Sequence, residues 1–205
     1  PYIYYITGEI EAAGQPTELS LLPAFESGFR AHVYSPDGAA GLWQFMPATG
    51  RIMAHKQYSW FDNIRNIPPS KESAIAYLQK LNKLFSGDWL NTLAAYNAGA
   101  GTVGKAIRRA SRRGEDTDFW SLDLPGETDR YVPRLLAVAM IVADPEGYGL
   151  ELPAVANKPF FAAAATGGQI DLNVAARLAG MSVEDLLALN AGHKRWASRP
   201  DGPHE

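Results

Sequence analysis

The first 150 residues repeat their apolar side chains at helical spacing, and no segment among them alternates apolar and polar residues as a half-buried strand does. One face of the first long helix carries four residues at intervals of three and four positions: Leu19, Leu22, Glu26 and Phe29. Further helices are expected to begin after Ser70, Asp88 and Thr102, which are residue types that cap helix N-termini. The spacing therefore predicts a mainly α domain.

Two prolines mark special positions in this helical pattern. A helix over residues 16–29 should be kinked at Pro23, because proline lacks the N–H donor and crowds the preceding turn. After Pro133, the stretch 135–143 is apolar on every side, which predicts the central and fully buried helix of the domain. No apolar run reaches the roughly 18 residues that a membrane span needs, so we expect no transmembrane helix.

The pattern changes near Pro153, which divides the chain into an expected first domain, residues 1–152, and a linker with a small appendage, residues 153–205. Within the appendage we expect a strand in 159–170 and short helices after Asp171 and Ser182, which makes it α+β. A closing strand would be expected beyond the last residue. Because a lone small strand is marginally stable, the appendage should lean on the main domain.

Composition excludes several classes of function. The chain is 46% hydrophobic and 20% charged, which is typical of a globular protein, and its net charge of −3 lacks the basic excess of a nucleic-acid binder. Cysteine is absent, which removes disulfides, thiolate metal sites and cysteine nucleophiles. The four histidines are scattered without metal-ligand spacing. We therefore expect neither a metal nor a cofactor.

Glu26 brings a carboxyl group to a helical face whose other members are apolar. Burial penalises the charged form of a carboxyl and so raises its pKa. A carboxyl that stays protonated near neutral pH is what a general acid needs in glycoside cleavage. Periodicity by itself leaves the alternative that Glu26 lies at the edge of the stripe, solvated or salt-bridged.

Four motifs, in the same order, resemble those of the soluble lytic transglycosylase domains. They are Glu26-Ser27, SPDGAAGLWQFMPATG over residues 35–50, AAYNAG over residues 94–99, and ETDRYVP over residues 127–133. The long WQFMP form and the tail after Pro153 look most like the membrane-bound lytic murein transglycosylase D branch. The resemblance implies a lysozyme-like (goose-type) helical fold and cleavage of the bond between N-acetylmuramic acid and N-acetylglucosamine in peptidoglycan.

The resemblance also implies roles for individual residues. Glu26 matches the catalytic acid and base, and Ser35 matches the serine that faces it across the cleft. Three more positions match cleft-lining residues: Gln44, Met46 and Tyr96. Tyr96 can also orient the Glu26 carboxyl, although ordinary polar residues satisfied by the backbone are the alternative reading of Tyr96 and Gln44. Tyr131 either serves the cleft or is a core tyrosine at the start of a helix.

The expected mechanism uses a single carboxyl group. Glycosidases with two carboxylates need a second Asp or Glu, and the best candidate here, Asp37, lies in a loop at a position that is variable in the family. We therefore interpret Asp37 as a solvated turn residue. Glu26 would protonate the leaving oxygen and then accept the proton of the sugar's own C6 hydroxyl, which closes a 1,6-anhydro ring. The alternatives are a hydrolytic lysozyme in which Asp37 positions water, and a wall-binding protein without turnover.

One stretch departs from the family pattern. The family often has an Asp-Gly-Arg-Arg-Asp-like sequence where this chain has DNIRN over residues 62–66, which puts any structural ion pair there in doubt.

The appendage resembles a glycan-binding LysM-like module, but its usual Gly-Asp-Thr-Leu start is replaced by GQIDL over residues 168–172. A packing role and a glycan-binding role both remain open. The expected partner is the peptidoglycan glycan strand, and the expected location is periplasmic. The chain starts without methionine, so we expect a targeting segment or N-terminal membrane anchor to be missing from view. We expect a monomer and no nucleic-acid partner.

Overall fold

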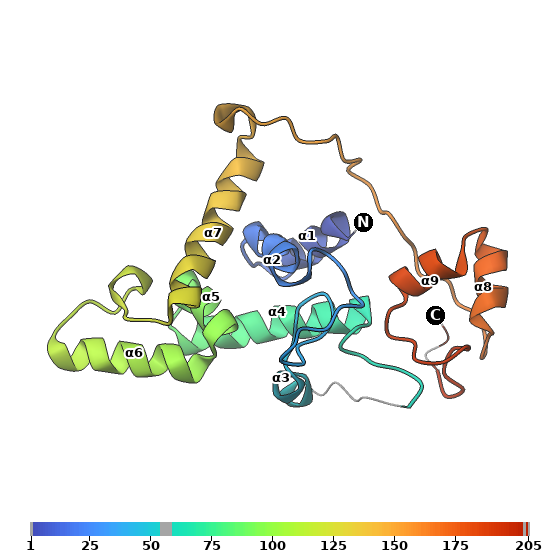
Figure 1. The fold of residues 1–205 in the computed structure, drawn as a ribbon, viewed down its shortest axis with the longest axis horizontal. Coiled ribbons are helices and arrows are strands. Elements are labelled where there is room, and N and C mark those ends of the chain that lie inside the picture. The colour runs from blue at the N-terminus through green and yellow to red at the C-terminus, as the bar shows by residue number, and fades with distance from the viewer. Residues whose placement is uncertain (1, 54–58, 203, 205) are drawn as a thin grey trace. The chain divides into compact units, whose positions relative to one another are not determined.

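The computed structural model describes residues 2–53, 59–202 and 204, and these form helices joined by loops (Figure 1). The chain divides into two compact units, the first made of Pro1–Ala74 and Asn157–Glu205 and the second of Ile75–Ala156. Among the described residues β pairing is limited to isolated bridges. The mainly α fold is therefore confirmed. No described helix is long and apolar enough to span a bilayer.

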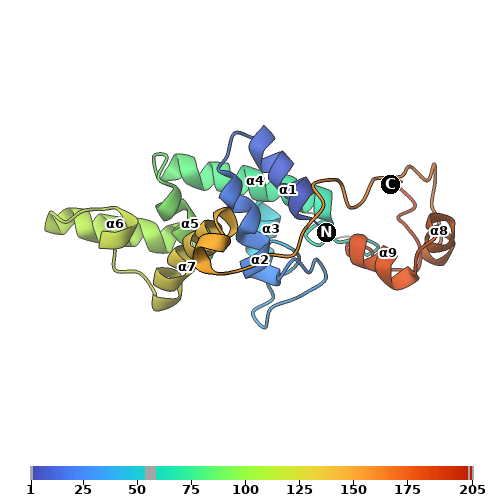
Figure 2. The same cartoon turned by 90° about the horizontal axis from the view of Figure 1, so that it is seen from above.

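The N-terminal part of the first unit is a set of short helices. They are α1 (Ile3–Ala12), the 3₁₀ helix η1 (Thr17–Leu21), α2 (Leu22–Ser27), α3 (Pro47–Ile52) and the start of α4 (Ile67–Leu84). η1 packs against both α1 and α2 (Figure 2). The side chains at their contact are at most 2% exposed: Ile6, Ile10, Leu19 and Leu22. This apolar cluster fixes the start of α2, on which Glu26 lies.

The expected continuous helix over residues 16–29 is wrong in detail. The segment forms η1 and then α2, and Pro23 lies in the first turn of α2 rather than at a kink. Proline is accepted there because the first N–H groups of a helix have no intrahelical partner. α2 ends at Gly28, whose φ of 59° is in the left-handed region. Phe29 therefore lies beyond the helix that carries Glu26.

The second unit contains the rest of α4 and the elements that follow it. They are α5 (Trp89–Ala98), α6 (Ala100–Arg113), η2 (Phe119–Ser121), α7 (Gly126–Ala143) and η3 (Glu146–Tyr148). Asp88 caps α5 as predicted, by accepting a 2.9 Å hydrogen bond from the Asn91 N–H. The prediction that Thr102 caps the next helix is wrong, because α6 begins at Ala100, directly after Gly99. α5 packs against both α6 and α7.

α7 is not the fully buried helix that its composition predicts. Val132 and Leu135 are buried, but Met140 is 59% exposed and Val142 is 48% exposed. A helix that is apolar on every side can be buried on every side only if other elements pack around it, and its own sequence does not say how many do. Within the described residues of the second unit, α7 packs against α5.

The C-terminal segment contains α8 (Leu172–Ala179) and α9 (Val183–Leu189), capped by Asp171 and Ser182 as predicted. Residues 159–170 do not form the expected strand. The last residues nevertheless close the segment, since the Ser198 N–H donates to the Ile170 carbonyl at 2.9 Å and the Leu172 N–H donates to the Trp196 carbonyl at 2.9 Å. In place of the expected closing strand, residues 196–198 thus close the segment by backbone hydrogen bonds to residues 170–172.

This segment also packs on α1, as expected of an appendage that is too small to stand alone. The Tyr2 hydroxyl donates to the Ala188 carbonyl at 3.1 Å, and the rings of Tyr5 and Phe161 lie 5.3 Å apart. The boundary that we expect at residue 153 stays a prediction.

Candidate active site

Glu26 lies in the last turn of α2 and is half-buried. Its neighbour Ser27 is buried, and the Ser27 hydroxyl lies 3.1 Å from the Pro23 carbonyl oxygen and 2.9 Å from the Leu42 carbonyl oxygen. A hydroxyl has one proton to donate, so the two carbonyls share it. This contact fastens the end of α2 to the GLWQ segment. The first motif thus meets the second through Ser27, a positioning role that the sequence analysis did not assign.

Ser35 opens the loop that leads to the GLWQ segment. Its N–H donates to the Ala39 carbonyl at 2.8 Å, and its Oγ accepts a hydrogen bond from the Ala39 N–H at 3.0 Å. These bonds fold residues 35–39 into a tight turn. Because Oγ acts as an acceptor toward Ala39, the hydroxyl proton can still be donated to a sugar oxygen. Asp37, at the tip of the turn, is exposed.

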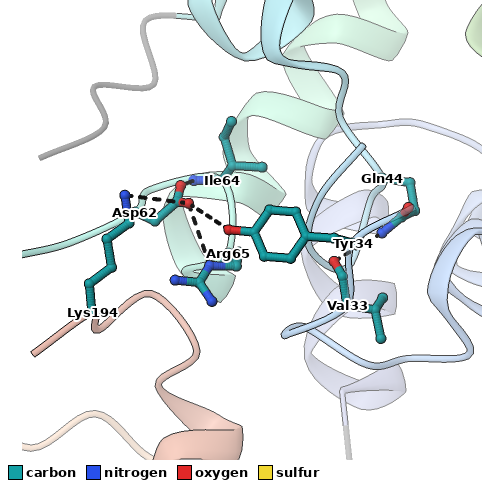
Figure 3. Close-up of polar contacts among 7 residues, drawn as sticks. All are labelled: Val33, Tyr34, Gln44, Asp62, Ile64, Arg65 and Lys194. Carbon is teal, nitrogen blue, oxygen red and sulfur yellow. Dashed lines mark hydrogen bonds and ion pairs between the residues drawn. The ribbon is translucent and has the colours of Figure 1, made fainter. Parts of the chain in front are cut away.

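Gln44 lies where the loop turns back, with a φ of 47°. Its Nε2 donates to the Gly41 carbonyl at 2.9 Å. It also donates to the Val33 carbonyl at 3.4 Å, and Figure 3 shows these two residues. These bonds show that the Gln44 side chain helps to shape the loop. For the side-chain nitrogen they match the alternative in which Gln44 is an ordinary polar residue that is hydrogen-bonded to the backbone. Next to it Trp43 is fully buried, whereas Met46 is 43% exposed. The role of Gln44 and Met46 in a cleft stays a prediction.

Gly41 is the position in this loop that most strictly requires glycine. Its φ is 78°, and a Cβ atom there would lie 2.5 Å from the Ile64 carbonyl oxygen. We expect Gly41→Ala to destabilise the protein by the cost of a left-handed alanine, about 1–2 kcal/mol, and by a further ~1–3 kcal/mol for the forced contact. Urea unfolding of the variant measures the sum.

Gly38→Ala is the matched control, since Gly38 has a φ of 84° and nothing lies within 4 Å of its added Cβ. The control should show the backbone cost alone. Equal destabilisation by the two substitutions would contradict the close approach of Gly41 to residue 64.

The third and fourth motifs meet in the second unit. The Thr128 hydroxyl of α7 lies 2.7 Å from the Asn97 side-chain oxygen of α5, and this hydrogen bond joins the two motifs directly. Tyr96 is half-buried, and its ring lies 5.9 Å from that of Tyr77. Tyr131 is also half-buried, on α7. The approach of Tyr96 and Tyr131 to Glu26, which belongs to the first unit, stays a prediction.

Asp62 is a functional candidate that the sequence analysis missed. It is 0% exposed, and its carboxylate accepts a 3.0 Å hydrogen bond from the Ile64 N–H. The cation of Arg65 lies 3.4 Å away and that of Lys194 lies 3.9 Å away. The doubt about an ion pair in the DNIRN stretch is thus resolved, because Asp62 pairs with Arg65 and with a lysine from the C-terminal segment. The available signal was a single aspartate directly after the apolar residues Trp60 and Phe61.

Tyr34, the residue before Ser35, also reaches Asp62. The Tyr34 hydroxyl lies 3.4 Å from the carboxylate, and the Arg65 guanidinium lies 5.4 Å from the Tyr34 ring centre (Figure 3). The pKa of Tyr34 is raised above its ordinary value, mainly by desolvation. The phenol donates a hydrogen bond to the Asp62 carboxylate.

Two family models match the chain. The transglycosylase SLT domain matches residues 5–119, and the LysM-like domain of lytic transglycosylase MltD matches residues 162–205. These matches cover the Glu26, Ser35 and Tyr96 motifs and the C-terminal segment.

Individual proteins are similar as well. The membrane-bound lytic murein transglycosylase D of Escherichia coli K12 is 42% identical over 203 residues, which are 99% of this chain and 45% of that protein. A putative tributyltin chloride resistance protein of an Alteromonas species is 32% identical over 79% of this chain and 76% of its own length. The chain thus spans less than half of the Escherichia coli relative.

Solved structures share the fold. A 70-kDa soluble lytic transglycosylase in complex with bulgecin A is 25% identical, with a TM-score of 0.54 over 69% of this chain and 24% of that one. The inactive mutant of lytic transglycosylase Slt from Pseudomonas aeruginosa is 21% identical, with a TM-score of 0.51 over 71% of this chain and 24% of that one.

Proposed function

The chain belongs to the family of the transglycosylase SLT domain, and from this premise we propose that it is a lytic transglycosylase that cleaves the glycan strands of peptidoglycan. In this proposal Glu26 is the catalytic acid and base. The substrate is the β-1,4 bond between N-acetylmuramic acid and N-acetylglucosamine, and the product carries a 1,6-anhydro-muramic acid end.

The placement of Glu26 is the observation that carries the proposal. Glu26 lies in the last turn of a short helix that begins at a fully buried leucine, Leu22. The end of this helix is tied to the GLWQ segment through the Ser27 hydroxyl. A half-buried carboxyl on such a rigid support is suited to general acid–base chemistry. Relatives support it, because the Escherichia coli protein is named a murein transglycosylase and one structural neighbour is an inactive variant with glutamine in place of a glutamate.

The proposed reaction has two steps at one carboxyl. Glu26 first donates its proton to the oxygen that leaves with N-acetylglucosamine, while the substrate's acetamido group stabilises the positive centre at C1 of the muramic acid. The Glu26 carboxylate then takes the proton of the C6 hydroxyl, whose oxygen bonds to C1. No water is consumed. Ser35, Gln44, Met46, Tyr96 and Tyr131 are proposed to line the glycan-binding cleft.

The names of the relatives also support a location in the cell envelope. A lytic transglycosylase meets its substrate in the periplasm, so we propose that location here. The C-terminal segment matches a LysM-like domain, which supports a second contact with the glycan strand.

Digestion of purified peptidoglycan sacculi tests the proposed function. The wild-type protein should release soluble muropeptides and lower the turbidity of the suspension, because each cleavage cuts a glycan strand. A wall-binding protein would instead sediment with the sacculi and leave the turbidity constant. That outcome would overturn the enzymatic proposal.

A further inference from the structure

The C-terminal segment contacts the stretch 60–62 through its turn 192–194. The Asp62 N–H donates to the Gly192 carbonyl at 2.8 Å, and the Lys194 N–H donates to the Trp60 carbonyl at 2.9 Å. Between these bonds the rings of Phe61 and His193 lie 4.9 Å apart. The turn 192–194 and the stretch 60–62 are therefore held together by their backbones.

Gly192 shows how close this approach is. Its backbone lies outside the left-handed region, so an alanine would fit there as far as backbone conformation is concerned. A Cβ atom at Gly192 would nevertheless lie 2.9 Å from the Phe61 ring and 3.0 Å from the Asp62 carbonyl oxygen. Only glycine lets the two segments meet at this distance.

Charge joins the same two segments. The side chain of Asp62 is 1% exposed and faces two cations, Arg65, which is 15% exposed, and Lys194, which is 30% exposed. Burial lowers the pKa of His193, so the imidazole is neutral at pH 7 and the positive charge of this turn comes from Lys194. A buried carboxylate is costly unless it is paired, so removing Lys194 leaves Asp62 less compensated.

Asp62 also contacts the residue next to the candidate site. The Tyr34 hydroxyl donates to the Asp62 carboxylate, and Tyr34 directly precedes Ser35. Tyr34 also pairs with Ala40 in an isolated β-bridge, and Ala40 pairs with Phe45, the neighbour of Gln44. Tyr34 is thus connected to both ends of the loop 35–44 by backbone pairing.

We propose that Lys194 and Gly192 of the LysM-like segment are positioning residues for cleavage, acting through Asp62 and Tyr34 on the loop that carries Ser35 and Gln44. The inference rests on the proposed function, in which that loop contacts the glycan. It gives the C-terminal segment a role in turnover itself, besides any role in holding the cell wall.

Gly192→Ala and Lys194→Met test the proposal in the full chain. Both variants should lower kcat/KM on a short soluble peptidoglycan tetrasaccharide by about tenfold or more, with a rise in KM, because a small misplacement of a binding group has a large effect on rate. Binding of sacculi, measured in a Glu26→Gln background, should stay within about twofold of the parent. Lys194→Arg should be more active than Lys194→Met, since arginine keeps the positive charge beside Asp62.

Gly168→Ala is the matched control for Gly192→Ala, because Gly168 lies in the same segment and nothing lies within 4 Å of its added Cβ. Tyr34→Phe supplies a second control. If Lys194 acts through the Tyr34 hydroxyl, the double variant Tyr34→Phe with Lys194→Met should lose no more activity than the worse single variant. Additive losses, or a lower melting temperature with unchanged KM, would show a merely structural contact and overturn the proposal.

The proposed function and the positioning role are tested by different outcomes. An inactive wild-type protein would overturn the proposed function, whereas active Gly192→Ala and Lys194→Met variants with weakened binding to sacculi would overturn only the positioning role. NMR gives a readout that needs no activity. The backbone amide signals of Ser35 and Gln44 should shift in Gly192→Ala and Lys194→Met and stay in place in Gly168→Ala. Unshifted signals in all three variants would contradict the connection.

Discussion

Glu26→Gln is expected to reduce cleavage of sacculi by at least about 10³-fold while leaving the fold intact. The amide keeps the shape of the side chain but can neither donate a proton to the leaving oxygen nor accept one from the C6 hydroxyl. Both steps of the proposed reaction use this one carboxyl, so both are lost together. Turnover is measured by the release of soluble muropeptides, and folding by the melting temperature.

Glu18→Gln is the matched control, because Glu18 is an exposed glutamate in the helix that precedes α2. It makes the same glutamate-to-glutamine change in the same region and should leave turnover unchanged. If Glu26→Gln kept even about a tenth of wild-type activity, general acid–base catalysis by Glu26 would be wrong, since such catalysis contributes about 10²-fold or more.

The second large effect concerns the product, which should end almost entirely in 1,6-anhydro-muramic acid. An intramolecular hydroxyl held against the reacting carbon has an effective concentration that reaches about 10⁵ M or more in favourable cases, far above that of water. Ring closure should therefore outrun hydrolysis. Mass spectrometry of the released muropeptides measures this directly, because each anhydro product is lighter by one water than the lysozyme product.

Asp37→Asn distinguishes this mechanism from hydrolysis. Asp37 is exposed at the tip of the turn that follows Ser35, so its substitution should change neither the rate nor the product. A hydrolase that uses Asp37 to position water would lose activity in this variant and would yield reducing ends as the main species. Those two results together would replace the transglycosylase proposal with the lysozyme alternative.

Local interactions account for what could be predicted of the helices. Asp88, Asp171 and Ser182 cap α5, α8 and α9 as expected, because a cap needs only a side chain and an N–H two or three residues later. Thr102 was the wrong choice for α6, since Gly99 already ends α5 and lets the chain turn directly into the next helix. A capping residue marks a possible start, and the neighbouring helix decides whether that start is used.

The motifs identify the residues of the candidate site. The structure adds the contacts that hold some of these residues in place. Glu26, Ser35 and Gln44 were singled out from the motifs. The residues that hold them in place were not identified. The Ser27 bond to Leu42 and the Asp62 bond to Tyr34 join residues that are far apart in the chain, and no periodic pattern of the sequence predicts such contacts. The cleft roles of Met46, Tyr96 and Tyr131 remain predictions that the substitutions above do not test.

The sequence by itself determined the helical class, the family and the carboxyl group on which the proposed chemistry depends, because these follow from short-range spacing and from motifs. Only the tertiary structure decided that half of α7 is left exposed and that Asp62 is neutralised by Lys194 as well as by its neighbour Arg65. Burial and ion pairing depend on which distant segments meet, and that is fixed by the packing of the whole unit rather than by any local pattern.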